Sequence, residues 1–188
     1  MTEEYIKKID AEQKAFKASL DKETDRGCSL MAASYLDYQL ENVIRAKLVN
    51  NETVVQKLFK FNGSLGSFSS KIEMAYSIGL IGEKAKKDLN LIRKIRNDFA
   101  HNYQPLSFTH KPMSDLCNQF YHDTPVKIRD AYRHNFTAAV VGVFAVIFGQ
   151  HLSTEHISEC NDIVIDEKMM KAIEKMKELK SKGNVDLI

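Results

Sequence analysis

Three polar side chains near the end of one predicted helix could act together on a phosphate. Arg96, Asn97 and His101 form the pattern R-N-x-x-x-H. A guanidinium can bind a phosphate, an amide can orient it, and an imidazole that titrates near neutral pH can move a proton. A structural alternative places His101 as a stabilising cation at the helix C-terminus, with Asn97 at the surface.

The position of Arg96 on its helix predicts an arginine that faces the protein core. At 100° per residue it falls within the apolar arc of residues 85–99. Its guanidinium keeps its charge when buried and therefore needs a carboxylate or an anionic ligand. Asp37 and Glu41 lie one turn apart beside the apolar stripe of an earlier helix and could supply the carboxylates. Arg45, four residues after Glu41, is a competing local partner for that acid.

A second polar pair, Asp25 and Arg26, stands where this earlier helix is expected to begin. Asp25 can cap the helix, and Arg26 can pair with an acid on a neighbouring helix. Ligand binding is the alternative role for both. Together with the residues above, they form a predicted polar cluster that consists of Asp25, Arg26, Asp37, Glu41, Arg96, Asn97 and His101.

The elements that position these residues are helices, because helical spacing runs through almost every long segment and no hairpin signal is present. We therefore predict an all-α fold, a single helical domain over residues 1–188 built as a bundle of about seven to eight helices. The last helix either docks on the bundle or binds a partner. The expected helices cover residues 3–20, 25–49, 52–59, 68–78, 83–103, 112–121, 124–151 and 166–182, with Thr124 and Pro125 as the start signal of the seventh.

The composition excludes several classes of protein. Hydrophobic residues make up 44% of the 188 residues, which argues against intrinsic disorder, and the net charge of +2 argues against nucleic-acid binding driven by the overall field. The apolar run 136–148 is shorter than the roughly 20 residues of a membrane span, so we expect a buried helix. The three cysteines form no C-x-x-C pair. We expect a cytoplasmic protein with no metal and no cofactor.

Three strings in this order resemble the mannitol operon repressor family of bacterial regulators. They are DRGCSLMAASYLDYQLE (25–41), NGSLGSFSSKIEMAYSIGLI (62–81) and DLNLIRKIRNDFAH (88–101), followed by LSF (106–108). The resemblance covers about residues 25–117. It implies an all-helical cytoplasmic protein that represses an operon for the uptake and utilisation of a sugar alcohol.

The residues restrict the mechanism that this resemblance implies. No short turn joins two helices with a basic second helix suited to the major groove. We therefore expect repression through contact with another regulatory protein or transcription factor, with direct DNA binding as the less favoured route. The apolar segment 138–148 suits either a central helix or the seam of a homodimer.

The alternative function is enzymatic, because R-N-x-x-x-H also resembles the motif of HEPN-domain ribonucleases, which are helical and place it at a dimer interface. That resemblance implies that Arg96 and His101 act on an RNA phosphate without a metal and that Asn97 orients them. Asp37 or Glu41 would support them. Our primary expectation is a protein that is not an enzyme.

Overall fold

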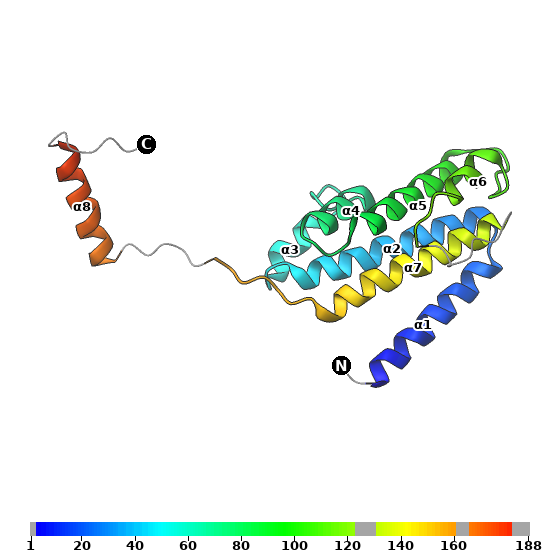
Figure 1. The fold of residues 1–188 in the computed structure, drawn as a ribbon, viewed down its shortest axis with the longest axis horizontal. Helices are drawn as coiled ribbons and strands as arrows, with labels where there is room; N and C mark the ends of the chain where they lie inside the picture. The colour runs from blue at the N-terminus through cyan, green and yellow to red at the C-terminus, as the bar shows by residue number, and fades with distance from the viewer. Residues whose placement is uncertain (1–2, 123–130, 161–165, 182–188) are drawn as a thin grey trace. The chain divides into compact units, whose positions relative to one another are not determined.

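The computed structural model describes residues 3–122, 131–160 and 166–181. This described part is all-helical, which confirms the predicted fold class. Its eight helices are α1 (Glu3–Lys22), α2 (Asp25–Lys47), α3 (Glu52–Leu58), α4 (Phe68–Ser77), α5 (Glu83–His101), α6 (Lys111–Cys117), α7 (Tyr132–Ser153) and α8 (Glu167–Ser181) (Figure 1).

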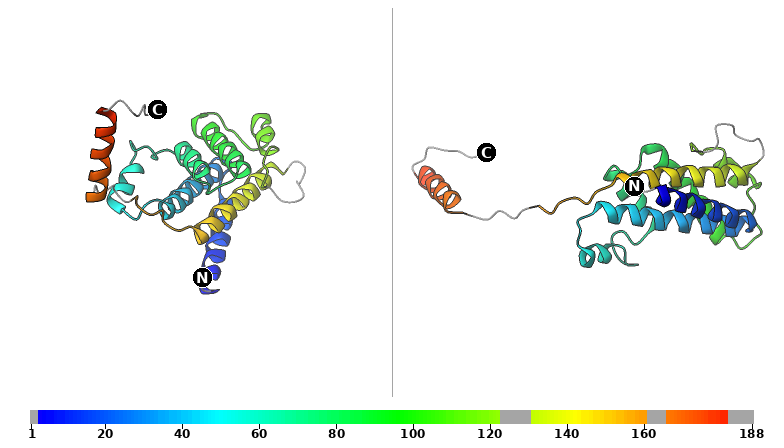
Figure 2. Two further views of the ribbon diagram at one scale, coloured as in Figure 1. Left: turned by 60° about the vertical axis from the view of Figure 1, so that its left-hand side comes forward. Right: turned by 90° about the horizontal axis from the view of Figure 1, so that it is seen from below.

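Helix α2 is central to the bundle and packs against α1, α4, α5 and α7. Figures 1 and 2 show α2, α5 and α7 running side by side along the bundle. The spacing of Leu36, Leu40 and Ile44 places them on one stripe, and all three are fully buried. The helix begins after Thr24, whose hydroxyl accepts a hydrogen bond from the Gly27 amide at 3.0 Å.

The loop before α4 ends in a cap for that helix. Ser67 and Ser70 form a reciprocal capping box, in which the Ser70 amide donates to the Ser67 hydroxyl at 3.0 Å. The spacing of these two serines, three residues apart, is the sequence signal for such a cap. A side chain at Gly66 would collide with the carbonyl oxygens of Lys60 and Phe61, so the tight loop requires glycine there.

Helix α7 begins later than the sequence signal predicts. Ala131 directly precedes it in a non-helical conformation, so the helix starts at Tyr132. The expected start signal, Thr124 and Pro125, lies outside the described residues. By length and composition α7 could also cross a membrane, with 39% of its most apolar window buried. In the bundle it packs against α2 and α5 and buries apolar residues of the run 136–148.

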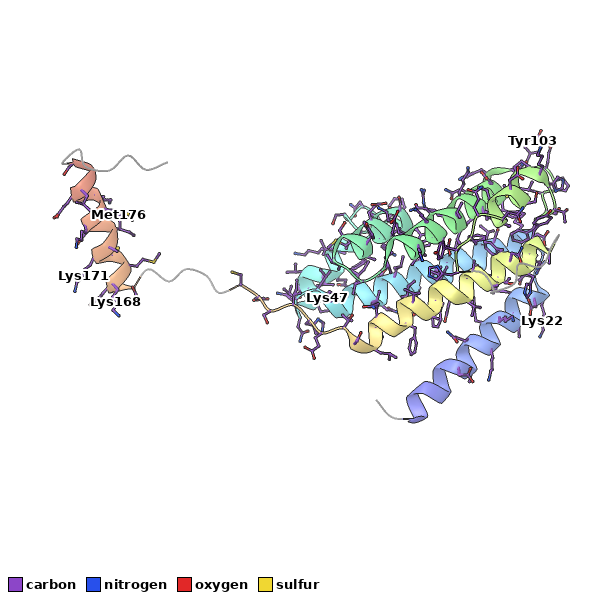
Figure 3. All side chains as sticks on the ribbon, viewed as in Figure 1. Lys22, Lys47, Tyr103, Lys168, Lys171 and Met176 are labelled. Carbon is purple, nitrogen blue, oxygen red and sulfur yellow. The ribbon has the colours of Figure 1, made fainter. Side chains whose placement is uncertain are left out.

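The chain divides into two compact units, residues 1–157 and residues 158–188. The first unit contains the helical bundle, with α1 to α7. The second contains α8, from which Lys168, Lys171 and Met176 project (Figure 3). Apolar and charged side chains are interleaved along α8, as the sequence indicates. Whether this helix docks on the bundle or binds a partner stays a prediction.

Candidate functional site

The two acids of the predicted cluster meet a lysine that the sequence did not single out. Lys71 of α4 is only 5% exposed, and its Nζ lies 3.0 Å from Asp37 Oδ1 and 2.9 Å from Glu41 Oε2. Arg45 completes the group, with Nη2 2.9 Å from Glu41 Oε1, which is the expected local pair. Its guanidinium also lies 4.4 Å above the centre of the Phe59 ring.

The titration of Glu41 reflects these contacts. Burial alone raises the pKa of this carboxyl, but hydrogen bonds from Lys71 and Arg45 outweigh burial and bring the pKa below its ordinary value. Glu41 is therefore ionised in the folded protein at neutral pH. The network has the character of a structural ion-pair cluster between α2 and α4.

Arg96 does not join this cluster, so the prediction that it would pair with Asp37 and Glu41 is wrong. Its side chain is half-buried, and its Nη1 donates to Asn97 Oδ1 at 3.0 Å. None of the carboxylates in the described part of the chain lies within ion-pair distance of Arg96. The physical reason is that α4, and not α5, presents the cation that reaches between the two acids of α2.

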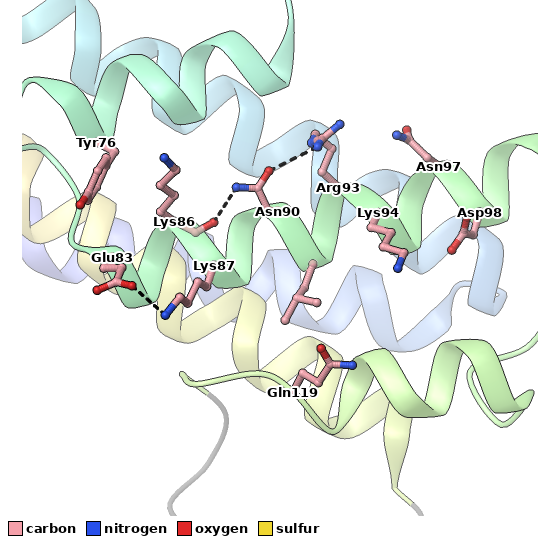
Figure 4. Close-up of a pocket in the computed structure, with 11 residues that line it drawn as sticks. Tyr76, Glu83, Lys86, Lys87, Asn90, Arg93, Lys94, Asn97, Asp98 and Gln119 are labelled. Carbon is pink, nitrogen blue, oxygen red and sulfur yellow. Dashed lines mark hydrogen bonds and ion pairs between the residues drawn. The ribbon is translucent and has the colours of Figure 1, made fainter.

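Arg96 instead lines a cavity of about 350 Å³ between α2, the start of α4 and α5. A second arginine, Arg93, joins it from one turn earlier on α5. Figure 4 shows Arg93 and Asn97 projecting from one side of α5, and Lys94 and Asp98 projecting in another direction. The lining is mostly polar and consists of Ala33, Ser34, Asp37, Gly66, Ser67, Phe68, Ser69, Arg93, Arg96 and Asn97.

The R-N-x-x-x-H residues do not converge on one point within a single chain. Asn97 hydrogen-bonds to Arg96, but His101 is the last residue of α5, is exposed, and lines another depression of about 520 Å³. Asn97 lines both hollows, whereas Arg96 lines only the first and His101 only the second. His101 lies at the helix C-terminus, the position that the structural alternative gives it.

Asp25 and Arg26 hold the start of α2 to distant segments. Asp25 is not the cap, because Thr24 takes that role. Its carboxylate accepts from the Phe108 amide at 3.0 Å and from Arg133 Nη1 at 2.8 Å. Arg26 does not pair with an acid in the described residues; its Nη2 donates to the Asn102 carbonyl at 2.6 Å. Both side chains therefore tie the bundle together and lie outside the cavity.

Sequence reasoning also missed Asp88, a fully buried carboxylate on α5. It accepts from the Tyr121 amide at 2.9 Å, from the His122 amide at 2.8 Å and from His122 Nδ1 at 3.0 Å. Helical spacing could have pointed to this residue, because Asp88 lies four positions before Ile92 and so falls on the apolar face of α5. The same spacing argument applies to Lys71, which lies three positions after Phe68 and so shares a face of α4 with it.

A larger groove of about 840 Å³ runs along the outer face of α5 (Figure 4). Four basic residues of α5 line it, namely Lys86, Lys87, Arg93 and Lys94. Two of them are paired with acids: Lys86 Nζ lies 2.7 Å from Glu73, and Lys87 Nζ lies 2.7 Å from Glu83. The groove therefore carries less uncompensated positive charge than its lysines suggest.

Comparison with known proteins gives a match at the level of the fold. No protein-family model matches the chain, and no curated protein matches it. A chain in the X-ray structure of the MtlR-HPr complex from Escherichia coli has a similar structure, with a TM-score of 0.55 and 16% sequence identity. The likeness covers 73% of this chain and 99% of that chain. The helical bundle described above is thus a fold shared with a chain of that complex.

Proposed function

We propose that this chain is a bacterial transcriptional regulator of the mannitol operon repressor type. It represses genes for the uptake and utilisation of a sugar alcohol by contacting another regulatory protein in the cytoplasm. The observation that carries the proposal is the shared fold, which spans 99% of a chain in the MtlR-HPr complex. The strings that resemble the repressor family support it, because they fall on α2, α4 and α5, which pack against one another.

The charge distribution supports a protein partner over direct binding to DNA. Affinity for DNA depends largely on cations that neutralise backbone phosphates. On α5, however, Lys86 and Lys87 are already paired with acids. A helical surface on which part of the positive charge is paired suits a protein contact, in which complementarity sets specificity. HPr is the first partner to test, because the similar structure is a complex that contains it.

The ribonuclease alternative lacks this support. It needs Arg96, Asn97 and His101 to face one phosphate, whereas within one chain Arg96 and His101 line different cavities. A second copy of the chain would have to complete the site. A regulator does not need these three side chains to meet at one phosphate. We therefore propose a regulator and assign no enzymatic activity.

The proposal is tested in the source bacterium by deleting the gene and measuring transcripts of sugar-alcohol uptake genes. We expect the transcripts to rise on deletion and to fall again when the wild-type chain is restored. The His101→Ala chain should restore repression equally well, since a regulator does not need that imidazole. Unchanged transcripts after deletion would contradict the regulator, and failure of His101→Ala alone would favour the nuclease.

A binding experiment tests the mechanism separately. Purified full-length chain is titrated with HPr of the same bacterium by isothermal calorimetry, and with the DNA upstream of the derepressed genes by gel shift. We expect saturable binding of the protein and no operator-selective DNA binding at physiological salt. Tight, sequence-selective DNA binding without any protein contact would reverse the mechanism.

A further inference from the structure

Two guanidinium groups enter the 350 Å³ cavity without a carboxylate partner. Arg93 Nη2 donates to Asn90 Oδ1 at 3.3 Å, and Arg96 Nη1 donates to Asn97 Oδ1 at 3.0 Å. Both contacts are with neutral amides. Arg93 Nε is buried and has no hydrogen-bond partner among the described residues. Each guanidinium therefore has a single hydrogen bond to the protein among those of the described residues, and its other N–H donors remain for a ligand in the cavity.

The first turn of α4 opens on the same cavity and adds backbone donors. The capping box occupies the amides of Ser67 and Ser70. The amides of Phe68 and Ser69, which both line the cavity, have no hydrogen-bond partner within the described residues. Unpaired amides and the dipole at a helix N-terminus attract anions. Here they lie in the same lining as the two arginines.

The acid in the cavity wall has a cation beside it. Asp37 is the only carboxylate in the described lining, and Lys71 holds it at 3.0 Å while also binding Glu41. Lys71 therefore offsets part of the negative charge of Asp37, which opposes Arg93 and Arg96 in the cavity wall. The cavity as a whole retains positive charge from the two guanidiniums.

These features define the chemistry of the ligand. Paired guanidiniums with neighbouring amides match a phosphate, whose oxygens accept several hydrogen bonds at once. The volume is at the lower end of the roughly 300–1,000 Å³ that small-molecule pockets occupy. We propose that the cavity between α2, α4 and α5 binds a phosphate dianion, either free or as the monoester of a small molecule. This ligand site is independent of the regulator proposal and of its protein partner.

The test is calorimetric titration of the full-length chain with inorganic phosphate, glycerol 3-phosphate and glycerol at one low ionic strength. We expect saturable one-to-one binding of the phosphates and none of glycerol. Tighter binding of glycerol 3-phosphate would identify an ester as the ligand, and equal affinities would identify free phosphate. Absence of binding by both phosphates would overturn the site.

Matched variants separate a built site from general attraction to a basic helix. Arg93→Gln should weaken phosphate binding roughly tenfold or more, because it removes a charged donor. Lys94→Gln removes the same charge from the next residue of α5, which does not line this cavity, and should leave the affinity unchanged (Figure 4). An equal loss in the two variants would show diffuse electrostatic attraction and would overturn the proposal.

A second variant pair uses an exposed position, so that folding is not at risk. Ser34 is exposed on α2 and lines the cavity. Ser34→Asp adds a negative charge beside the guanidiniums and should abolish phosphate binding, whereas Ser34→Asn should retain it. Far-ultraviolet circular dichroism checks that each variant is folded. Retained binding in Ser34→Asp would place the phosphate elsewhere and contradict the assignment.

Discussion

Replacing Lys71 with methionine should destabilise the bundle far more than the same replacement of Arg96. Lys71→Met leaves Asp37 and Glu41 facing each other without their shared cation. Removing one partner of a fully buried ion pair costs about 3–5 kcal/mol. Here the carboxylate side chains keep 32% and 24% of their exposure, so water offsets part of the cost and we expect a loss of about 2–3 kcal/mol. Arg96→Met breaks no ion pair with a described residue and should cost less than about 1 kcal/mol.

Urea unfolding followed by circular dichroism at 222 nm measures both losses, since the chain is helical and contains no tryptophan. The two losses can be compared if the slope of unfolding free energy against urea concentration is the same in the wild type and both variants. A Lys71→Met chain as stable as the wild type, or an Arg96→Met chain equally destabilised, would refute the assignment of the acids to Lys71.

The pH dependence gives a second check on the same network. Because the pKa of Glu41 in the folded chain is below its ordinary value of 4.5, its stabilisation is complete above pH 4.5. It is lost as the pH falls through the lower, folded-state pKa. Lys71→Met has lost the part of this contribution that comes from Lys71, while Arg45 still binds Glu41, so the difference in stability between wild type and variant should narrow below pH 4.5. A gap that widens on acidification would contradict this linkage.

Three further outcomes test other parts of the structure. Asp88→Ala leaves two backbone amides without their acceptor and should lower the free energy of unfolding by about 2–4 kcal/mol; a loss under about 1 kcal/mol would show that water replaces the carboxylate. Burial raises the pKa of Cys28 to about 11 and of Cys117 to about 12, so at about pH 8 Ellman's reagent should react quickly with exposed Cys160 and slowly with the other two thiols. Quick reaction of all three before unfolding would refute the burial. Purified chain should leave RNA intact, and cleavage that disappears in His101→Ala would establish the nuclease.

Local signals predicted the helices well because they act over a few residues. The capping serines before α4 and the stripe of Leu36, Leu40 and Ile44 both follow from short-range spacing, and the structure contains them as expected. The same local reasoning placed the start of α7 too early. A cap followed by proline favours a helix start, but Ala131 is not helical and α7 begins only at Tyr132.

Pairing between helices was harder to predict, since it depends on tertiary geometry. Lys71 and Arg96 both fall near apolar arcs of their helices, and spacing alone does not say which cation reaches Asp37 and Glu41. The sequence analysis favoured the arginine because Arg96 falls within the apolar arc of its helix and keeps its charge when buried. The structure places the flexible lysine there, because α4 packs against α2 at the level of the two acids.

Because Lys71, and not Arg96, pairs with Asp37, the ion-pair network that stabilises the bundle is connected to the cavity. Asp37 belongs to both, since it binds Lys71 and lines the cavity with Arg93 and Arg96. Without Lys71, Asp37 would carry an uncompensated charge beside the guanidiniums and compete with a bound anion. Lys71→Met should therefore weaken phosphate binding even though Lys71 does not line the cavity, and adding Asp37→Asn should restore it. Phosphate affinity that is unchanged in Lys71→Met would show that the ion-pair network and the cavity are independent.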